Sequence, residues 1–282
     1  MTVHYRATPK QVIPVLTSLI FAGTLTYGLQ ISKVEVVPIT LFPETPSGAS
    51  LNASIFVVMM AATATLMYLL LRYKRKEVVK YLIATAVFLV AFFLLNWYGQ
   101  LYATQLDPFV DVHGYGWMGI TGVVAGILLT GLYRGSERVR LASVTVVGSL
   151  TGTFLGASVP TLTAVILLAA LAVYDLISVY RGPIGKIAEM TDLEEFKGAV
   201  FTVGDLTIGM GDLVFYSMLV SNAMINLGAL AYLGTFLGVV AGSLLGFKML
   251  ERREMFPGLP FAIGLGLLAM LLVGQLQAQF GI

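Results

Sequence analysis

Long apolar segments of about twenty residues follow one another along most of this chain, separated by shorter polar connections. A helix rises about 1.5 Å per residue, so about 20 residues cross the roughly 30 Å hydrocarbon core of a bilayer. The pattern therefore predicts nine transmembrane helices within a single membrane domain. Their expected ranges are 11–32, 51–71, 80–103, 115–133, 141–158, 161–180, 198–221, 227–247 and 257–280.

The composition supports lipid as the solvent of this chain. Only 11% of its 282 residues are Asp, Glu, Lys or Arg, while 57% are apolar. A soluble domain carries about 25% charged residues, and a chain with so few could not cover its surface in water. We therefore expect an all-α integral membrane protein. The absence of cysteine excludes disulfides, thiol catalysis and cysteine-ligated metals.

The basic residues give the expected orientation. Every Lys and Arg except Lys33 falls in connections on one side of the nine predicted helices. Cytoplasmic loops carry an excess of these residues. The pattern predicts a cytoplasmic amino terminus and an extracytoplasmic carboxyl terminus. Because membrane topology explains the positions of the basic residues, we expect no nucleic acid as a partner.

Two predicted helices carry glycine at every fourth position. The residues are Gly148, Gly152 and Gly156 in the fifth span, and Gly234, Gly238, Gly242 and Gly246 in the eighth. Spacing of four places them on one helix face, where missing side chains let another helix approach closely. We interpret these glycines as packing features and expect a compact bundle around both helices.

Most carboxylates lie in connections or near the ends of predicted spans, and Asp175 and Asp212 are the exceptions. Asp175 is six residues before Arg181, and Asp212 lies within the next span. An ionisable group at membrane depth costs several kcal/mol, so a function and a partner should be sought. The sixth and seventh spans are antiparallel neighbours. Asp175 is therefore expected to face Asp212 at similar depth, near the cytoplasmic side.

Two carboxyl groups this close cannot both ionise cheaply, so the pair shares a proton. One member can act as a general base on water while the protonated member polarises a peptide carbonyl, which is aspartic-protease chemistry. Two alternatives stay open at this point. The acids could be separately satisfied by hydrogen bonds, or could form a proton or cation pathway in a transporter.

The surroundings of the acids favour an approaching peptide chain. Gly209 and Gly211 flank Met210 and leave bare backbone beside Asp212. Residues 198–203 are β-branched and aromatic in part, and could be an extended edge for an unwound substrate or simply continue the seventh helix. Pro257-Gly258-Leu259-Pro260 opens the last span with irregular backbone, which at membrane depth lines a cavity or is buried in protein.

Together these segments resemble a known family. Tyr174-Asp175, Gly209-Met210-Gly211-Asp212 and Pro257-Gly258-Leu259-Pro260 look like the YD, GxGD and PxL motifs of presenilin and signal peptide peptidase. The nine-span plan and the inside amino terminus are similar to presenilin, whereas signal peptide peptidases run inverted. We identify the sequence as similar to a microbial presenilin homologue, in the cell membrane.

The resemblance implies an intramembrane aspartyl protease with Asp175 and Asp212 as its catalytic dyad. Tyr174, Gly209, Met210 and Gly211 would line the site with the segment Pro257–Pro260. The expected substrates are transmembrane helices of other proteins, hydrolysed without a metal or organic cofactor. The connection after the sixth span is far shorter than the large loop of presenilin, so the chain could act uncut. We expect no need for accessory subunits, and a homo-oligomer is allowed.

A second enzyme class with a GxGD acid is the type IV prepilin peptidases. There, Asp192 and Asp205 would have to serve as partner acids near the cytoplasm, and the tyrosine–aspartate and proline motifs would go unexplained. A metal enzyme finds no support either, because His4 and His113 are expected on opposite sides of the membrane.

Overall fold

The computed structural model of the protein describes residues 9–33, 36–106, 112, 114–181, 200–203, 206–251 and 257–280. The alternative partner acids Asp192 and Asp205, and both histidines, lie outside these residues. The elements in chain order are η1 (Pro9–Val12), α1 (Ile13–Ile31), α2 (Pro46–Arg72), α3 (Lys76–Leu106), α4 (Tyr115–Arg134), α5 (Glu137–Ser158), α6 (Thr161–Arg181), β1 (Val200–Val203), β2 (Leu206–Gly209), α8 (Met210–Leu227), α9 (Ala229–Leu250) and α10 (Leu259–Phe280).

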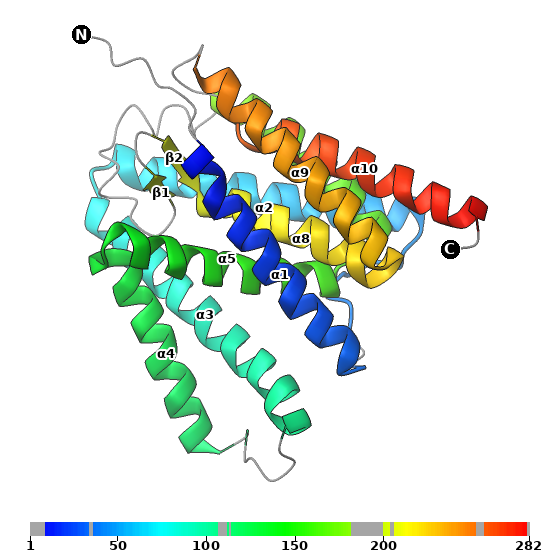
Figure 1. The fold of residues 1–282 in the computed structure, drawn as a ribbon. Coiled ribbons are helices and arrows are strands. Elements are labelled where there is room, and N and C mark those ends of the chain that lie inside the picture. Colours follow the sequence, from blue (N-terminus) through cyan, green and yellow to red (C-terminus); the bar gives the residue numbers. More distant parts are fainter. Residues whose placement is uncertain are drawn as a thin grey trace.

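The described residues form nine long helices, and the expected all-α membrane fold is confirmed. Eight of the helices are long and apolar enough to cross a membrane. The ninth, α8, carries Asp212, Asn222 and Asn226. It contacts α1, α5, α6, α9 and α10, and therefore meets protein on most sides (Figure 1). This position explains its polarity, since polar side chains in a membrane helix face the interior of the bundle.

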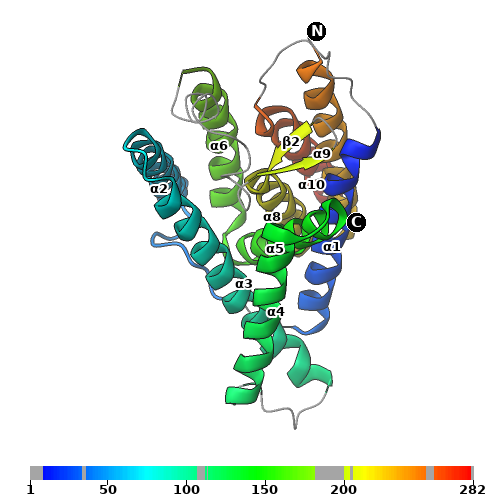
Figure 2. The same cartoon turned by 90° about the vertical axis from the view of Figure 1, so that its left-hand side faces the viewer.

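The outer helices form pairs around this centre. α3 and α4 pack against one another, and α2 lies against α6 (Figure 2). α9 and α10 run side by side on the opposite flank (Figure 1). α2 and α6 expose large apolar side chains such as Val58, Leu66 and Ile177. These are the surfaces expected to face lipid tails.

The predicted glycine faces are contact surfaces between helices. A Cβ atom on Gly156 would lie 2.6 Å from the Met218 carbonyl oxygen of α8, and one on Gly238 would lie 2.6 Å from the Leu265 carbonyl oxygen of α10. Real Cβ atoms do not approach other atoms so closely, so only glycine permits these crossings. Gly246 differs, because a Cβ there would meet no heavy atom within 4 Å.

Buried hydroxyl and amide groups join α1, α5 and α8. The Ser18 hydroxyl lies 2.9 Å from that of Ser149 and 3.0 Å from that of Ser217. The Asn222 side-chain amide donates hydrogen bonds of 3.0 and 2.9 Å to the carbonyl oxygens of Gly156 and Val159. Such bonds hold helices together where lipid offers no hydrophobic driving force. They fix the position of α8, and with it Asp212.

The predicted seventh span, 198–221, is wrong at both ends. Residues 200–203 and 206–209 form the antiparallel hairpin β1–β2, and the helix runs from Met210 to Leu227. Phe201 pairs with Ile208 across the hairpin, and both side chains are buried. Alternation of β-branched and aromatic residues on a half-buried surface favours strand over helix. The extended alternative for this segment is therefore correct, with β2 as its partner.

Candidate active site

Three segments meet at one end of the bundle: the last turns of α6, the first turn of α8 and the residues that open α10. The three helices contact one another. Asp175 comes from α6, Asp212 from α8, and Pro257 and Gly258 precede α10. Residues from three separate sequence motifs thus gather in one place.

Asp212 belongs to the first turn of its helix and not to the helix interior. Gly209 ends β2 in an extended conformation and is the N-cap of α8, so Asp212 is the third helical residue. Its carboxylate accepts a hydrogen bond from the Gly209 backbone N–H. A side chain at this position commonly reaches back to the N-cap N–H, which is left free by the helix geometry. The strand-to-helix junction therefore orients the carboxylate.

One dipeptide of the α10 segment contacts both carboxyl groups. The Leu259 backbone N–H donates a hydrogen bond of 3.1 Å to Oδ2 of Asp175. Gly258 packs against Asp212 so closely that a Cβ on Gly258 would lie 2.5 Å from Oδ2 of Asp212. The two carboxyl groups also interact electrostatically with one another. The carboxyl groups of Asp175 on α6 and Asp212 on α8 therefore contact two consecutive residues of one backbone segment.

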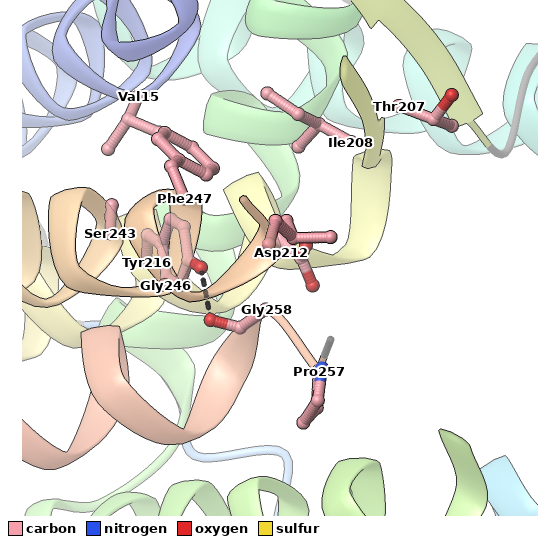
Figure 3. Close-up of a pocket in the computed structure, with 11 residues that line it drawn as sticks. Val15, Thr207, Ile208, Asp212, Tyr216, Ser243, Gly246, Phe247, Pro257 and Gly258 are labelled. Carbon is pink, nitrogen blue, oxygen red and sulfur yellow. Dashed lines mark hydrogen bonds between the residues drawn. The ribbon is translucent and has the colours of Figure 1, made fainter. Parts of the chain in front are cut away.

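A cavity of about 50 Å³ lies beside Asp212 (Figure 3). This volume has room for a few water molecules at about 10–15 Å³ each. The residues that line it come from α1, the hairpin, α8, α9 and the α10 segment. They are Val15, Thr207, Ile208, Asp212, Tyr216, Ser243, Gly246, Phe247, Leu250, Pro257 and Gly258.

Several of these lining residues are not part of any sequence motif. Tyr216 could have been found from its spacing, because residues four apart share a helix face and Asp212 precedes it by four. The Tyr216 hydroxyl donates a hydrogen bond of 2.9 Å to the Gly258 carbonyl oxygen (Figure 3). Val15, Ser243 and Phe247 lie far from the motifs in sequence, and only the packing of α1 and α9 brings them to Asp212.

The other predicted site residues occupy varied positions. Tyr174 is half-buried on α6, Met210 is half-buried at the start of α8, Pro257 is buried and Pro260 is half-buried in the first turn of α10. A Cβ on Gly209 would approach nothing closer than 3.8 Å, and one on Gly211 nothing closer than 4.0 Å.

Close packing of the described residues therefore does not require either glycine of the GxGD motif. The close approach to Asp212 is made at Gly258 instead. Gly211 is exposed, so its bare backbone is open to a chain from outside. Among the described residues, no three His, Asp or Glu side chains are grouped so that they could hold a metal ion.

The chain is similar to known proteins in sequence and in fold. The sequence model of a family described as Presenilin matches residues 42–195, which include Asp175. Presenilin-B of Dictyostelium discoideum is 30% identical over 131 residues. That alignment covers 43% of this chain and 28% of the relative, so it spans well under a third of that protein.

The fold is similar to solved structures over almost its whole length. Two structures of a presenilin family intramembrane aspartate protease, in different space groups, each align with a TM-score of 0.67 at 23% sequence identity. They cover 95% and 96% of this chain, and 100% and 99% of the respective solved chains. At this level of identity the similarity shows the fold.

Proposed function

Because the chain belongs to the presenilin family, we propose that it is an intramembrane aspartyl protease that hydrolyses peptide bonds within or near transmembrane helices of other proteins. Asp175 and Asp212 are its catalytic dyad. The observation that carries this proposal is the contact of one dipeptide, Gly258-Leu259, with both carboxyl groups. Carboxyl groups that serve separate structural roles have no reason to share one backbone segment.

The proposed reaction follows from a shared proton. Two neighbouring carboxyl groups hold one proton between them, since both cannot ionise cheaply. The ionised member removes a proton from water, whose oxygen adds to the carbonyl carbon of the peptide bond, while the protonated member donates to the carbonyl oxygen. Proton transfer to the amide nitrogen then breaks the C–N bond and gives a carboxylic acid and an amine. The titration belongs to the pair, so neither role is assigned to one residue.

The hairpin suggests how a substrate is held. A transmembrane helix must unwind before its peptide carbonyl can be reached, and an unwound segment needs partners for its backbone groups. Thr207 and Ile208 of β2 line the cavity beside Asp212. We propose that the extended substrate pairs with the edge of β2 opposite β1, which holds its backbone next to the dyad.

The basic residues support an inside amino terminus, with the dyad towards the cytoplasm. Arg181 ends α6 six residues after Asp175, and Lys248 lies in the last turn of α9. Both helix ends are on the side that the charge pattern assigns to the cytoplasm. Water then reaches the dyad from the cytoplasmic side.

The test is cleavage of a labelled single-span protein by the purified chain in liposomes. We expect two products whose new termini lie within the span, and inhibition by a hydroxyl-bearing transition-state analogue. The Asp175→Ala and Asp212→Ala variants should be inactive. Cleavage by the purified chain alone would also support the absence of accessory subunits. Undiminished cleavage by either variant would contradict the dyad.

The rival function is a proton- or cation-coupled transporter that uses the same carboxylates. Liposomes that contain the chain separate the two functions, because solute or ion flux can be measured in the same preparation. Flux that depends on Asp175 and Asp212 in the absence of proteolysis would replace the protease proposal with the transporter.

Gly258→Ala is expected to lower kcat about 10- to 100-fold, because the new methyl group would lie 2.5 Å from Oδ2 of Asp212 and must displace one of them. The measurement is kcat and KM for the single-span substrate. Gly264→Ala on the same helix is the control, since a Cβ there meets no heavy atom within 4 Å. Equal activity of the two variants would contradict the tight contact.

Gly246→Val is expected to lower kcat about tenfold by occupying the cavity beside Asp212, where the attacking water would otherwise be held. Gly246 lines this cavity, and its Cβ position is free of other atoms, so the change fits the fold. Gly264→Val adds the same side chain at an equally open position outside the cavity. We expect a loss of kcat for Gly246→Val alone, and a similar loss in both variants would refute the role of the cavity.

A further inference from the structure

Tyr216 connects α8 to the segment that touches both carboxyl groups. Its side chain is 3% exposed and lies on the same helix face as Asp212, one turn further along α8. The hydroxyl donates to the Gly258 carbonyl oxygen at 2.9 Å, and Ser243 of α9 lines the same cavity. Figure 3 shows the ring beside Asp212 with the hydroxyl directed at the segment.

The backbone that accepts this bond sets the geometry of the dyad. Gly258 packs on Asp212, and the next N–H, that of Leu259, binds Asp175. A displacement of Gly258 therefore moves the contacts of both carboxyl groups at once. Pro257 and Pro260, on either side, have no backbone N–H with which to anchor the segment.

The two hydrogen bonds of this segment respond differently to the reaction. The bond from Leu259 ends on a carboxyl oxygen of Asp175, and a hydrogen bond to an ionised carboxylate is roughly twice as strong as one to a neutral group. Its strength therefore changes whenever the shared proton moves. The bond from Tyr216 ends on a backbone carbonyl and keeps its strength through the reaction.

We propose that Tyr216 is a positioning residue, which holds the segment Pro257–Leu259 in place against the dyad while the charge of the dyad changes. This inference rests on the proposed proteolytic function. Tyr216 itself does not contact the reacting peptide bond. It acts through Gly258, and its hydrogen bond ties α8 to the segment that opens α10.

The test is Tyr216→Phe, which removes the hydroxyl and keeps the buried ring. We expect kcat to fall about tenfold, with KM changed less than about threefold, because the segment no longer keeps its register with the dyad. Backbone hydrogen exchange of residues 257–265 should become faster, since their anchoring is weakened. Melting temperatures in detergent show whether this variant and its control are folded.

Tyr232→Phe is the matched control. The Tyr232 hydroxyl also joins two helices by donating to a backbone carbonyl oxygen, that of Leu19, at 3.1 Å, but it lies outside the site. This variant should keep its kcat and the exchange rate of residues 257–265. Unchanged kcat and exchange in Tyr216→Phe would overturn the inference, as would a loss of kcat without faster exchange, which would mean direct action on the substrate.

The exchange measurement does not depend on catalysis. If the parent protein cleaves no substrate, the proposed function fails, while faster exchange in Tyr216→Phe alone still supports an anchoring role for the tyrosine. If the parent cleaves and Tyr216→Phe behaves like Tyr232→Phe, the proposed function stands and the inference fails.

Discussion

Replacing Asp212 by asparagine, or Asp175 by asparagine, is expected to lower kcat for a single-span substrate by about 10²- to 10⁴-fold. Asparagine has nearly the same shape as aspartate but can neither ionise nor carry the shared proton. In the Asp212→Asn variant, the side-chain amide oxygen can still accept from the Gly209 N–H, as the carboxylate does. The loss is therefore chemical, with little change in the fold.

The two replacements act on one unit, so their effects should not add. The double variant is expected to be about as inactive as either single variant, because residues that act together lose their shared function at once. Glu137→Gln, in the first turn of α5, is the control for loss of a carboxylate elsewhere and should keep full activity. Cleavage within about tenfold of the parent in either single variant would rule out the dyad.

Gly152→Ala is expected to destabilise the protein by about 1–3 kcal/mol, which is the usual cost of forcing an extra carbon into a packed interior. The new Cβ would contact the Val214 carbonyl oxygen, and would lie 2.5 Å from the Ser217 Cβ and 2.9 Å from the Met218 nitrogen. These atoms are mostly backbone, so α5 and α8 must separate. The measurement is thermal unfolding in detergent.

Gly126→Ala on α4 is expected to stabilise the protein instead, because a Cβ there meets no heavy atom within 4 Å. Alanine favours helix over glycine by about 1 kcal/mol, and nothing offsets this gain at the open position. A lower melting temperature for Gly152→Ala and an equal or higher one for Gly126→Ala would support glycine as a packing residue of α5. Equal changes in the two variants would contradict it.

The sequence predicted the helices well where lipid faces them. α2 and α3 each contain a long, strongly apolar stretch, since one face meets lipid and the other meets protein, so hydropathy alone located them. The predicted start of the seventh span, residue 198, was wrong because the hairpin β1–β2 and the start of α8 are both largely apolar. Phe201 and Ile208 are paired and buried on one side of the hairpin, which favours strands over a helix there. Hydropathy along the sequence does not reveal this burial.

By itself, the sequence determined the helical membrane fold, the two carboxylates and the segment Pro257–Pro260, because residue type and spacing suffice for each. Only the tertiary structure decided that Gly258, and not Gly209 or Gly211, makes the close contact with Asp212. It also decided that Tyr216 holds Gly258, and that Val15 and Ser243 line the same cavity. The physical reason is that these contacts join helices far apart in the chain, and spacing along one helix carries no information about which neighbour it meets.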